Sequence, residues 1–197
     1  TLGSAGTHLK LTDSNETLSL NNLALETGAG SLTLAGPLSL SNNGQLNSTG
    51  GTIWLAGATI PDGTSISIPN TILQLSNAMS VTGGTLKTDS TTIYTNARAL
   101  TLTNGSILEV QGTQDLSGVV PDTSSTLRLA ANATINAIPA LSVGTLDLAN
   151  FALTLNDQMA GLTVVQAVTL DAATEQIISG DADLSLNGGV TVSNGIL

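Results

Sequence analysis

Apolar and polar residues alternate in short segments along most of this chain. The segments Ser31-Leu32-Thr33-Leu34, Thr126-Leu127-Arg128-Leu129 and Thr145-Leu146-Asp147-Leu148 each read polar, apolar, polar, apolar. A period of two residues is typical of a β-strand that buries one face and exposes the other. Helix signals are weak, because Gly and the β-branched residues are frequent, and residues 171–176 are the one plausible helical turn. The pattern therefore predicts an all-β fold.

The strand-like segments recur at a regular spacing. Most are about 20 residues apart, judged from the first apolar residue of each. These residues are Leu32, Ile53, Leu73, Ile93, Leu108, Leu127, Leu146, Val164 and Leu184. The one short step, from Ile93 to Leu108, indicates either a shortened repeat or a slip in the alignment of the repeats. Two further series of apolar residues lie between, and turn residues such as Asn42-Asn43-Gly44 and Asn104-Gly105 separate the segments, since Asn and Gly tolerate a positive φ.

A repeat of this length with two or three short strands fits few architectures. A propeller blade needs about 40 residues, and a leucine-rich repeat needs its Asn and a helical side. The best fit is a single right-handed parallel β-helix, a β-solenoid of about ten coils of roughly 19–20 residues, in which residues 1–197 form one domain. Inward Leu, Ile and Val would form continuous columns whose burial, at about 25 cal/mol per Å², is the main stabilising contribution.

Four motifs carry a resemblance to a known group of proteins. They are Gly50-Gly51-Thr52-Ile53, Gly83-Gly84-Thr85-Leu86, Leu100-Thr101-Leu102-Thr103-Asn104-Gly105 and Gly144-Thr145-Leu146-Asp147-Leu148. Their turn chemistry and spacing resemble the β-helix passenger and stalk repeats of bacterial surface proteins of the autotransporter and filamentous-haemagglutinin type. The resemblance is compositional, covers nearly the whole chain and transfers no functional residue. It implies an exported protein, extracellular or on the bacterial surface, with a structural or adhesive role.

The composition argues against several classes of function. The net charge is −10 and only four residues are basic, so the chain lacks the clustered cations that neutralise nucleic-acid phosphates. No apolar run approaches the roughly 20 residues of a membrane-spanning helix. Cysteine is absent and His8 is the only histidine, so thiolate metal sites and a histidine-based triad are not expected. We interpret His8 as an exposed strand residue and expect no cofactor and no metal site.

If the apolar residues point inward, the residues between them form an outward column. That column reads Thr33, Trp54, Gln74, Tyr94, Glu109, Arg128, Asp147, Val165 and Ser185. It stacks the only Trp and the only Tyr two coils apart and places Arg128 between two carboxylates. The candidate binding face is therefore Trp54, Gln74, Tyr94, Glu109, Arg128 and Asp147. The competing interpretation is a surface charge ladder beside two chance aromatic residues.

Outward residues also bear on two further functions, ice binding and catalysis. A second set of columns is rich in Ser and Thr, a composition that can match ice: Ser39, Thr59, Ser80, Thr101, Thr134, Thr154, Thr169 and Thr191. Polysaccharide-acting β-helix enzymes need clustered carboxylates, and Asp181 and Asp183 are close in sequence but lack a basic neighbour. Both functions stay open as interpretations, although we expect no enzymatic activity.

The function predicted from these patterns is structural. A stiff stalk or fibre segment on a bacterial surface would hold or present an adhesive surface, with host or matrix surfaces as candidate targets. A solenoid ends in unpaired strand edges, which recruit partners, and residues 195–197 carry no charged or proline-rich cap. We therefore expect end-to-end contact with flanking solenoid repeats or with copies of the chain. The alternative is a binding module that uses the Trp54 and Tyr94 face.

Overall fold

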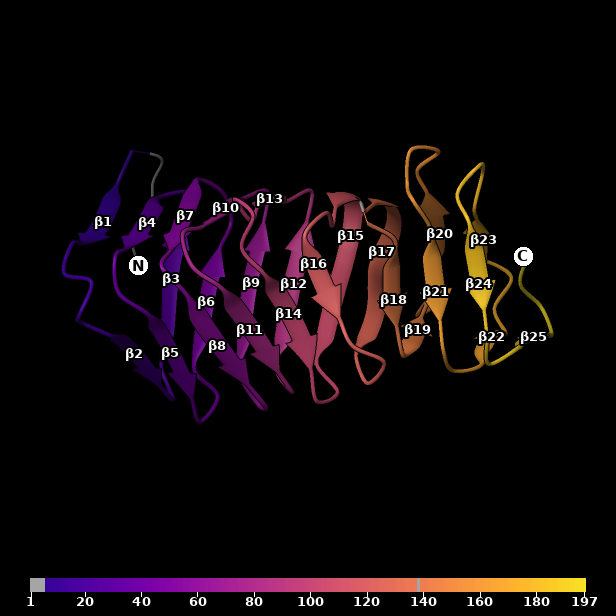
Figure 1. The fold of residues 1–197 in the computed structure, drawn as a ribbon, viewed down its shortest axis with the longest axis horizontal. Coiled ribbons are helices and arrows are strands. Elements are labelled where there is room, and N and C mark those ends of the chain that lie inside the picture. Colours follow the sequence, from indigo (N-terminus) through magenta and orange to yellow (C-terminus); the bar gives the residue numbers. More distant parts are fainter. Residues whose placement is uncertain (1–5, 138) are drawn as a thin grey trace.

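A computed structural model describes residues 6–137 and 139–197, and these form a rod of stacked strands with β1 (His8–Leu11) and β25 (Val190–Val192) toward opposite ends (Figure 1). The prediction of an all-β right-handed parallel β-helix is confirmed, with about nine turns in place of the expected ten. Each turn contributes one strand to each of three faces. Every strand pairing between successive turns is parallel. Within these described ranges no helix has the length and apolarity needed to cross a membrane.

The three faces are defined by their strands. Face 1 contains β1 (His8–Leu11), β4 (Ser31–Leu34), β7 (Thr52–Leu55), β10 (Ile72–Leu75), β13 (Thr92–Tyr94), the second parts of β15 (Ile107–Asp115) and β17 (Thr126–Asn136), β20 (Ala152–Leu155) and β23 (Gln176–Ile178). Face 2 contains β2 (Leu18–Asn21), β5 (Leu38–Ser41), β8 (Ala58–Pro61), β11 (Met79–Thr82), β14 (Leu100–Thr103), β16 (Val119–Pro121), β18 (Leu141–Val143), β21 (Leu162–Val164) and β24 (Leu184–Leu186). Face 3 contains β3 (Ala24–Gly28), β6 (Gln45–Ser48), β9 (Ser65–Pro69), β12 (Thr85–Asp89), the first parts of β15 and β17, β19 (Thr145–Asp147), β22 (Val168–Leu170) and β25 (Val190–Val192).

The register of the strands explains the short step between Ile93 and Leu108. Ile93 lies on face 1, where its neighbour Thr92 is opposite Asp115 of the next turn. Leu108 lies on face 3, opposite Leu86 of the preceding turn. The step is therefore a slip between two faces of one coil. The slip arises because all three faces carry the same period-2 alternation, and nothing in that alternation labels a face.

The core consists of inward apolar columns, as predicted. On face 1, Leu32, Ile53 and Leu73 are fully buried and lie directly above one another in register. Face 2 contributes residues such as Ile60 and Val81, which are also fully buried and in register. Each turn thus buries its apolar side chains against the turns above and below, so the stability of any coil depends on its neighbours.

Buried hydroxyl groups line a corner between faces 3 and 1, a feature absent from the sequence prediction. The Ser48 hydroxyl donates to the Gly50 carbonyl at 2.7 Å, and the Thr71 hydroxyl donates to Ser48 Oγ at 3.1 Å. One turn later, the Thr91 hydroxyl donates to the Ile68 carbonyl at 2.5 Å. These hydroxyl groups can be buried because each one forms a hydrogen bond within the corner or with the turn below.

The turn at Asn42-Asn43-Gly44 forms where predicted, but its glycine is not needed for a positive φ. Asn42 and Asn43 adopt the positive φ values, 47° and 64°. Gly44 is not in that region; a Cβ placed on it would lie 2.0 Å from the Leu20 carbonyl oxygen of the preceding turn. The glycine is therefore required for the close approach of two stacked corners.

Face 3 is interrupted near the C-terminal end of the rod. Among the described residues, β19 pairs only with β17, and β22 pairs only with β25. The segment at residues 171–176, expected as the one plausible helical turn, forms a non-helical turn beside this interruption. Glu175 closes that turn: its backbone N–H donates to the Ala172 carbonyl, and its buried carboxylate accepts the N–H groups of Asp171 and Ala172.

Candidate functional site

The predicted outward column divides among the three faces of the rod, and its last two members, Val165 after β21 and Ser185 in β24, belong to face 2. Trp54 pairs in register with Gln74, and Gln74 with Tyr94, on face 1. Glu109, Arg128 and Asp147 are in register with one another on face 3. The prediction of one continuous column is therefore wrong, for the same reason as the slip at Ile93: a new face was entered without any change in the alternation. Arg128 does lie between Glu109 and Asp147, as expected.

The aromatic residues on face 1 form an exposed, hydrogen-bonded surface. The indole Nε1 of Trp54 donates to Gln74 Oε1 at 2.7 Å. Trp54 is 37% exposed and Tyr94, two turns away, is 50% exposed. The bond fixes the orientation of the Gln74 amide. The Nε2 group of that amide has no acceptor within the described part of the chain and is available to a ligand. This surface presents one aromatic face, one amide and one phenol along the rod axis.

His8 joins this surface, a contact that the sequence analysis missed. It is exposed, as expected, but its Nε2 lies 2.9 Å from Thr33 Oγ1 and its ring is nearly parallel to that of Trp54, with the centroids 6.4 Å apart. A pocket of about 310 Å³ opens at this point between the ends of β1, β4 and β7. Its lining residues are His8, Lys10, Thr33, Leu34, Ala35, Trp54 and Ser76. The sequence could have indicated this contact through the register of the first coil. In that register, Lys10 is opposite Thr33, the residue below Trp54.

The charged residues on face 3 form two separate ion pairs. Lys87 Nζ lies 3.2 Å from Glu109 Oε1, and Arg128 Nε lies 2.9 Å from Asp147 Oδ2. Lys87 was absent from the predicted site because the slipped alignment placed it in another column, although it is opposite Glu109 in register. The column therefore reads Lys87, Glu109, Arg128, Asp147 with alternating sign, as in a surface charge ladder.

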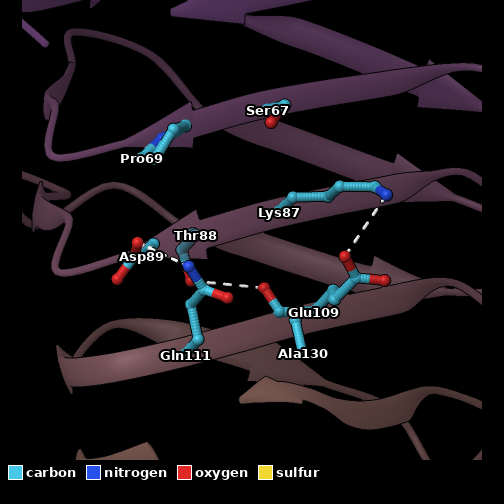
Figure 2. Close-up of a pocket in the computed structure, with 8 residues that line it drawn as sticks. All are labelled: Ser67, Pro69, Lys87, Thr88, Asp89, Glu109, Gln111 and Ala130. Atoms are coloured by element: carbon cyan, nitrogen blue, oxygen red, sulfur yellow. Dashed lines mark hydrogen bonds and ion pairs between the residues drawn. The ribbon is translucent and has the colours of Figure 1, made fainter. Parts of the chain in front are cut away.

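A small pocket lies beside the first of these pairs, as Figure 2 shows. Its volume is about 130 Å³. Lys87 is bound to Glu109, and the Gln111 amide donates to Asp89 Oδ2 at 2.5 Å (Figure 2). Each charged group on this pocket thus has a partner on an adjacent turn, which favours a structural role for the pocket.

We expect the Arg128–Asp147 pair to contribute little to stability. Both side chains are about 40% exposed, and exposed ion pairs contribute about 0–1 kcal/mol. A double-mutant cycle with Arg128→Leu and Asp147→Asn should therefore give a coupling free energy below about 1 kcal/mol in chemical denaturation, and smaller still at high salt. A coupling above about 2 kcal/mol would contradict a ladder of independent surface pairs.

The carboxylates with displaced pKa values organise turns. The pKa of Asp122 lies below its ordinary value because the carboxylate accepts hydrogen bonds from the hydroxyl and backbone N–H of Ser124 and from the Ser125 hydroxyl. Burial raises the pKa of Glu175, but donation by the N–H groups of Ala172, Asp171 and Asn150 brings it below the ordinary value. Both carboxylates are hydrogen-bonded within their turns, Asp122 to two hydroxyl groups and a backbone N–H, and Glu175 to backbone N–H groups. Both therefore stabilise the turns in which they lie.

The remaining predicted residues also disperse. The Ser and Thr column holds together on face 2 as Ser39, Thr59, Ser80 and Thr101, and then meets Val120. Thr134 and Thr154 are on face 1, and Thr169 and Thr191 on face 3. Asp181 and Asp183 lie on an exposed turn. No cluster of three or more His, Asp or Glu suited to a metal ion occurs among residues 6–137 and 139–197.

Comparisons with known protein families, with curated proteins and with solved structures find no match to this chain.

Proposed function

We propose that this chain is a structural segment of an extracellular bacterial rod or fibre that joins further β-solenoid coils end to end. The observation that carries the proposal is the exposure of apolar side chains at both ends of the described part of the rod. At the C-terminal end, Val192, Ile196 and Leu197 are about half exposed or more. At the other end, Leu9, Leu11 and Leu18 are only partly buried, although they continue the inward columns. Apolar columns left open in this way gain free energy when another coil covers them.

The backbone supports the same proposal. The C-terminal residues already begin a further turn, because Ile196 bridges in parallel to Gln176 of β23. Within the described part of the chain, β1 pairs only with β4 and β25 only with β22. A coil of the same kind, from flanking repeats or from a second copy, offers parallel strands to both edges. The bacterial surface location rests on the resemblance and the composition discussed above.

The test is the state of association of the chain at rising concentration, measured by sedimentation and negative-stain electron microscopy. Rods that lengthen with concentration are expected. Val192→Lys, which places a charge on the open end, should keep the rods at single length. Val120→Lys is the matched control, because Val120 is 53% exposed on face 2, and it should lengthen like the wild type. Rods of single length at every concentration in the wild type would overturn self-association and leave only flanking repeats as partners.

A second candidate function is ligand binding on face 1. The observation that favours it is the in-register row of Trp54, Gln74 and Tyr94, in which both aromatic side chains are exposed and one amide is oriented. Exposed aromatic rings aligned along a rod suit a long ligand such as a glycan. The double variant Trp54→Ala, Tyr94→Ala tests this function: loss of binding to cells or polysaccharides is expected, and unchanged binding would remove it.

A further inference from the structure

Face 1 has an unusual charge for this protein over its first five turns. The outward residues of β1, β4, β7, β10 and β13 include His8 and Lys10 but no carboxylate. The whole chain has 14 Asp and Glu against four Lys and Arg. The acidic side chains lie instead in turns, at the end of β15 and on face 3, where Glu26, Asp89, Glu109 and Asp147 are found. The strands of face 2 also lack carboxylates but carry no basic residue, so this half of face 1 is the surface most favourable to an anion.

The pocket at Trp54 concentrates the positive charge of that surface. Lys10 and His8 both line it, and its lining residues include no Asp or Glu. Of the other basic residues, Lys87 and Arg128 are paired with carboxylates, whereas Lys10 and Arg98 have no carboxylate partner in the described residues. Arg98 lies in the connection after β13 and does not line the pocket. The nearest acidic residues in sequence, Asp13 and Glu16, lie in the turn after β1 and do not line the pocket. Lys10 is thus an unpaired ammonium beside an exposed indole.

From this arrangement we infer that the pocket binds a carboxylate-bearing pyranose, that is, one residue of an acidic glycan. The inference rests on the second candidate function, ligand binding on face 1. The apolar C–H face of a pyranose packs on an aromatic ring, which Trp54 supplies. The carboxylate forms a charge-assisted hydrogen bond with the Lys10 ammonium. The hydroxyl groups of the sugar meet the polar groups of Thr33, Ser76 and the oriented amide of Gln74.

The row on face 1 gives the ligand a direction. Turns of a β-helix are separated by about 4.8 Å, so Tyr94 lies about 10 Å along the axis from Trp54. A linear glycan that starts at Lys10 and runs along face 1 meets Trp54, then Gln74, then Tyr94. The inferred ligand is therefore a chain of acidic sugars, in which the residue at Trp54 supplies the carboxylate that Lys10 recognises.

The experiment is calorimetric titration of the chain with a short oligomannuronate and with the same oligomer after methyl esterification of its carboxylates. The acidic form should bind about tenfold more tightly than the ester, since one charge-assisted bond is lost. Lys10→Gln should weaken binding of the acid about tenfold and leave binding of the ester unchanged. Lys87→Gln, which removes a lysine on face 3, is the matched control and should bind like the wild type. Thermal melting of each variant verifies its fold.

The outcomes separate this inference from the function on which it rests. Equal affinity for acid and ester, with both lost in Trp54→Ala, would overturn the carboxylate inference and leave glycan binding on face 1 intact. Absence of binding of either oligomer, or equal effects of Lys10→Gln and Lys87→Gln, would overturn the pocket itself. If Lys10→Gln binds the acid more weakly than the wild type at low salt and equally at high salt, the result supports an ion pair between Lys10 and the ligand. None of these readouts depends on end-to-end association.

Discussion

The substitution Gly44→Ala is expected to destabilise the rod by about 3 kcal/mol, because the added Cβ overlaps a rigid neighbour. That neighbour is the Leu20 carbonyl oxygen, 2.0 Å from the Cβ position, and the Ser41 carbonyl oxygen is 3.0 Å from it. Both are backbone atoms, so neither can move without a shift of strand β2 or strand β5. For a chain of this size the midpoint of thermal unfolding should fall by about 6–12 °C.

The matched control is Gly105→Ala. Gly105 has a φ of +73° and no atom within 4 Å of its Cβ position, so the change tests backbone strain alone. Strain of this kind costs about 1–2 kcal/mol. Hydrogen exchange should show the loss in Gly44→Ala concentrated in the first turns, because each turn contacts only its neighbours. Equal destabilisation by the two variants would contradict close approach of the stacked corners as the reason for glycine at residue 44.

The second large effect is expected at Glu175. Its buried carboxylate accepts the backbone N–H of Asn150 at 3.1 Å and that of Asp171 at 2.7 Å, and so ties the turn at residues 171–176 to the turn below. Glu175→Gln removes the charge and places an amide donor against backbone donors. Hydrogen bonds to charged groups contribute about 1.5–3 kcal/mol, so a loss of about 2 kcal/mol is expected in chemical denaturation at neutral pH.

The contribution of Glu175 should depend on pH with a defined sign. The folded-state pKa lies below the ordinary Glu value, since the backbone donors outweigh the effect of burial. The stabilisation is therefore fully present above about pH 4.3, the ordinary pKa of Glu. It declines as the pH falls below that value, because the unfolded chain then binds a proton that the folded chain does not. It is lost once the pH is below the folded-state pKa.

The measurement is the difference in unfolding free energy between the wild type and Glu175→Gln from pH 7 down to pH 3. The difference should shrink as the pH falls. Glu16→Gln serves as the control, because Glu16 is exposed and none of its side-chain atoms has a hydrogen bond among those described. Its difference from the wild type should stay near zero at all pH values. A difference for Glu175→Gln that is constant with pH would assign the effect to packing.

The sequence by itself determined the fold class and the residues of the core. Period-2 alternation fixes which side chains of a strand share a face, and a repeat near 20 residues leaves the parallel β-helix as the economical solution. Alternation and spacing alone place Leu32, Ile53 and Leu73 in one buried column, and they form one. The local stacking of Glu109, Arg128 and Asp147 was also predictable, because a single face supplies all three.

Only the tertiary structure decided which face each column occupies, and hence what the candidate site contains. All three faces carry the same alternation, so the alternation does not show that the chain passes two corners, before and after β14, between Tyr94 and Glu109. These corners separate the aromatic row from the charge ladder. Stacking of the first turn beneath the third brings His8 and Lys10 to Trp54. These contacts join residues more than 40 positions apart in the sequence, and their distance is set by the pitch of the coil, which no local pattern encodes.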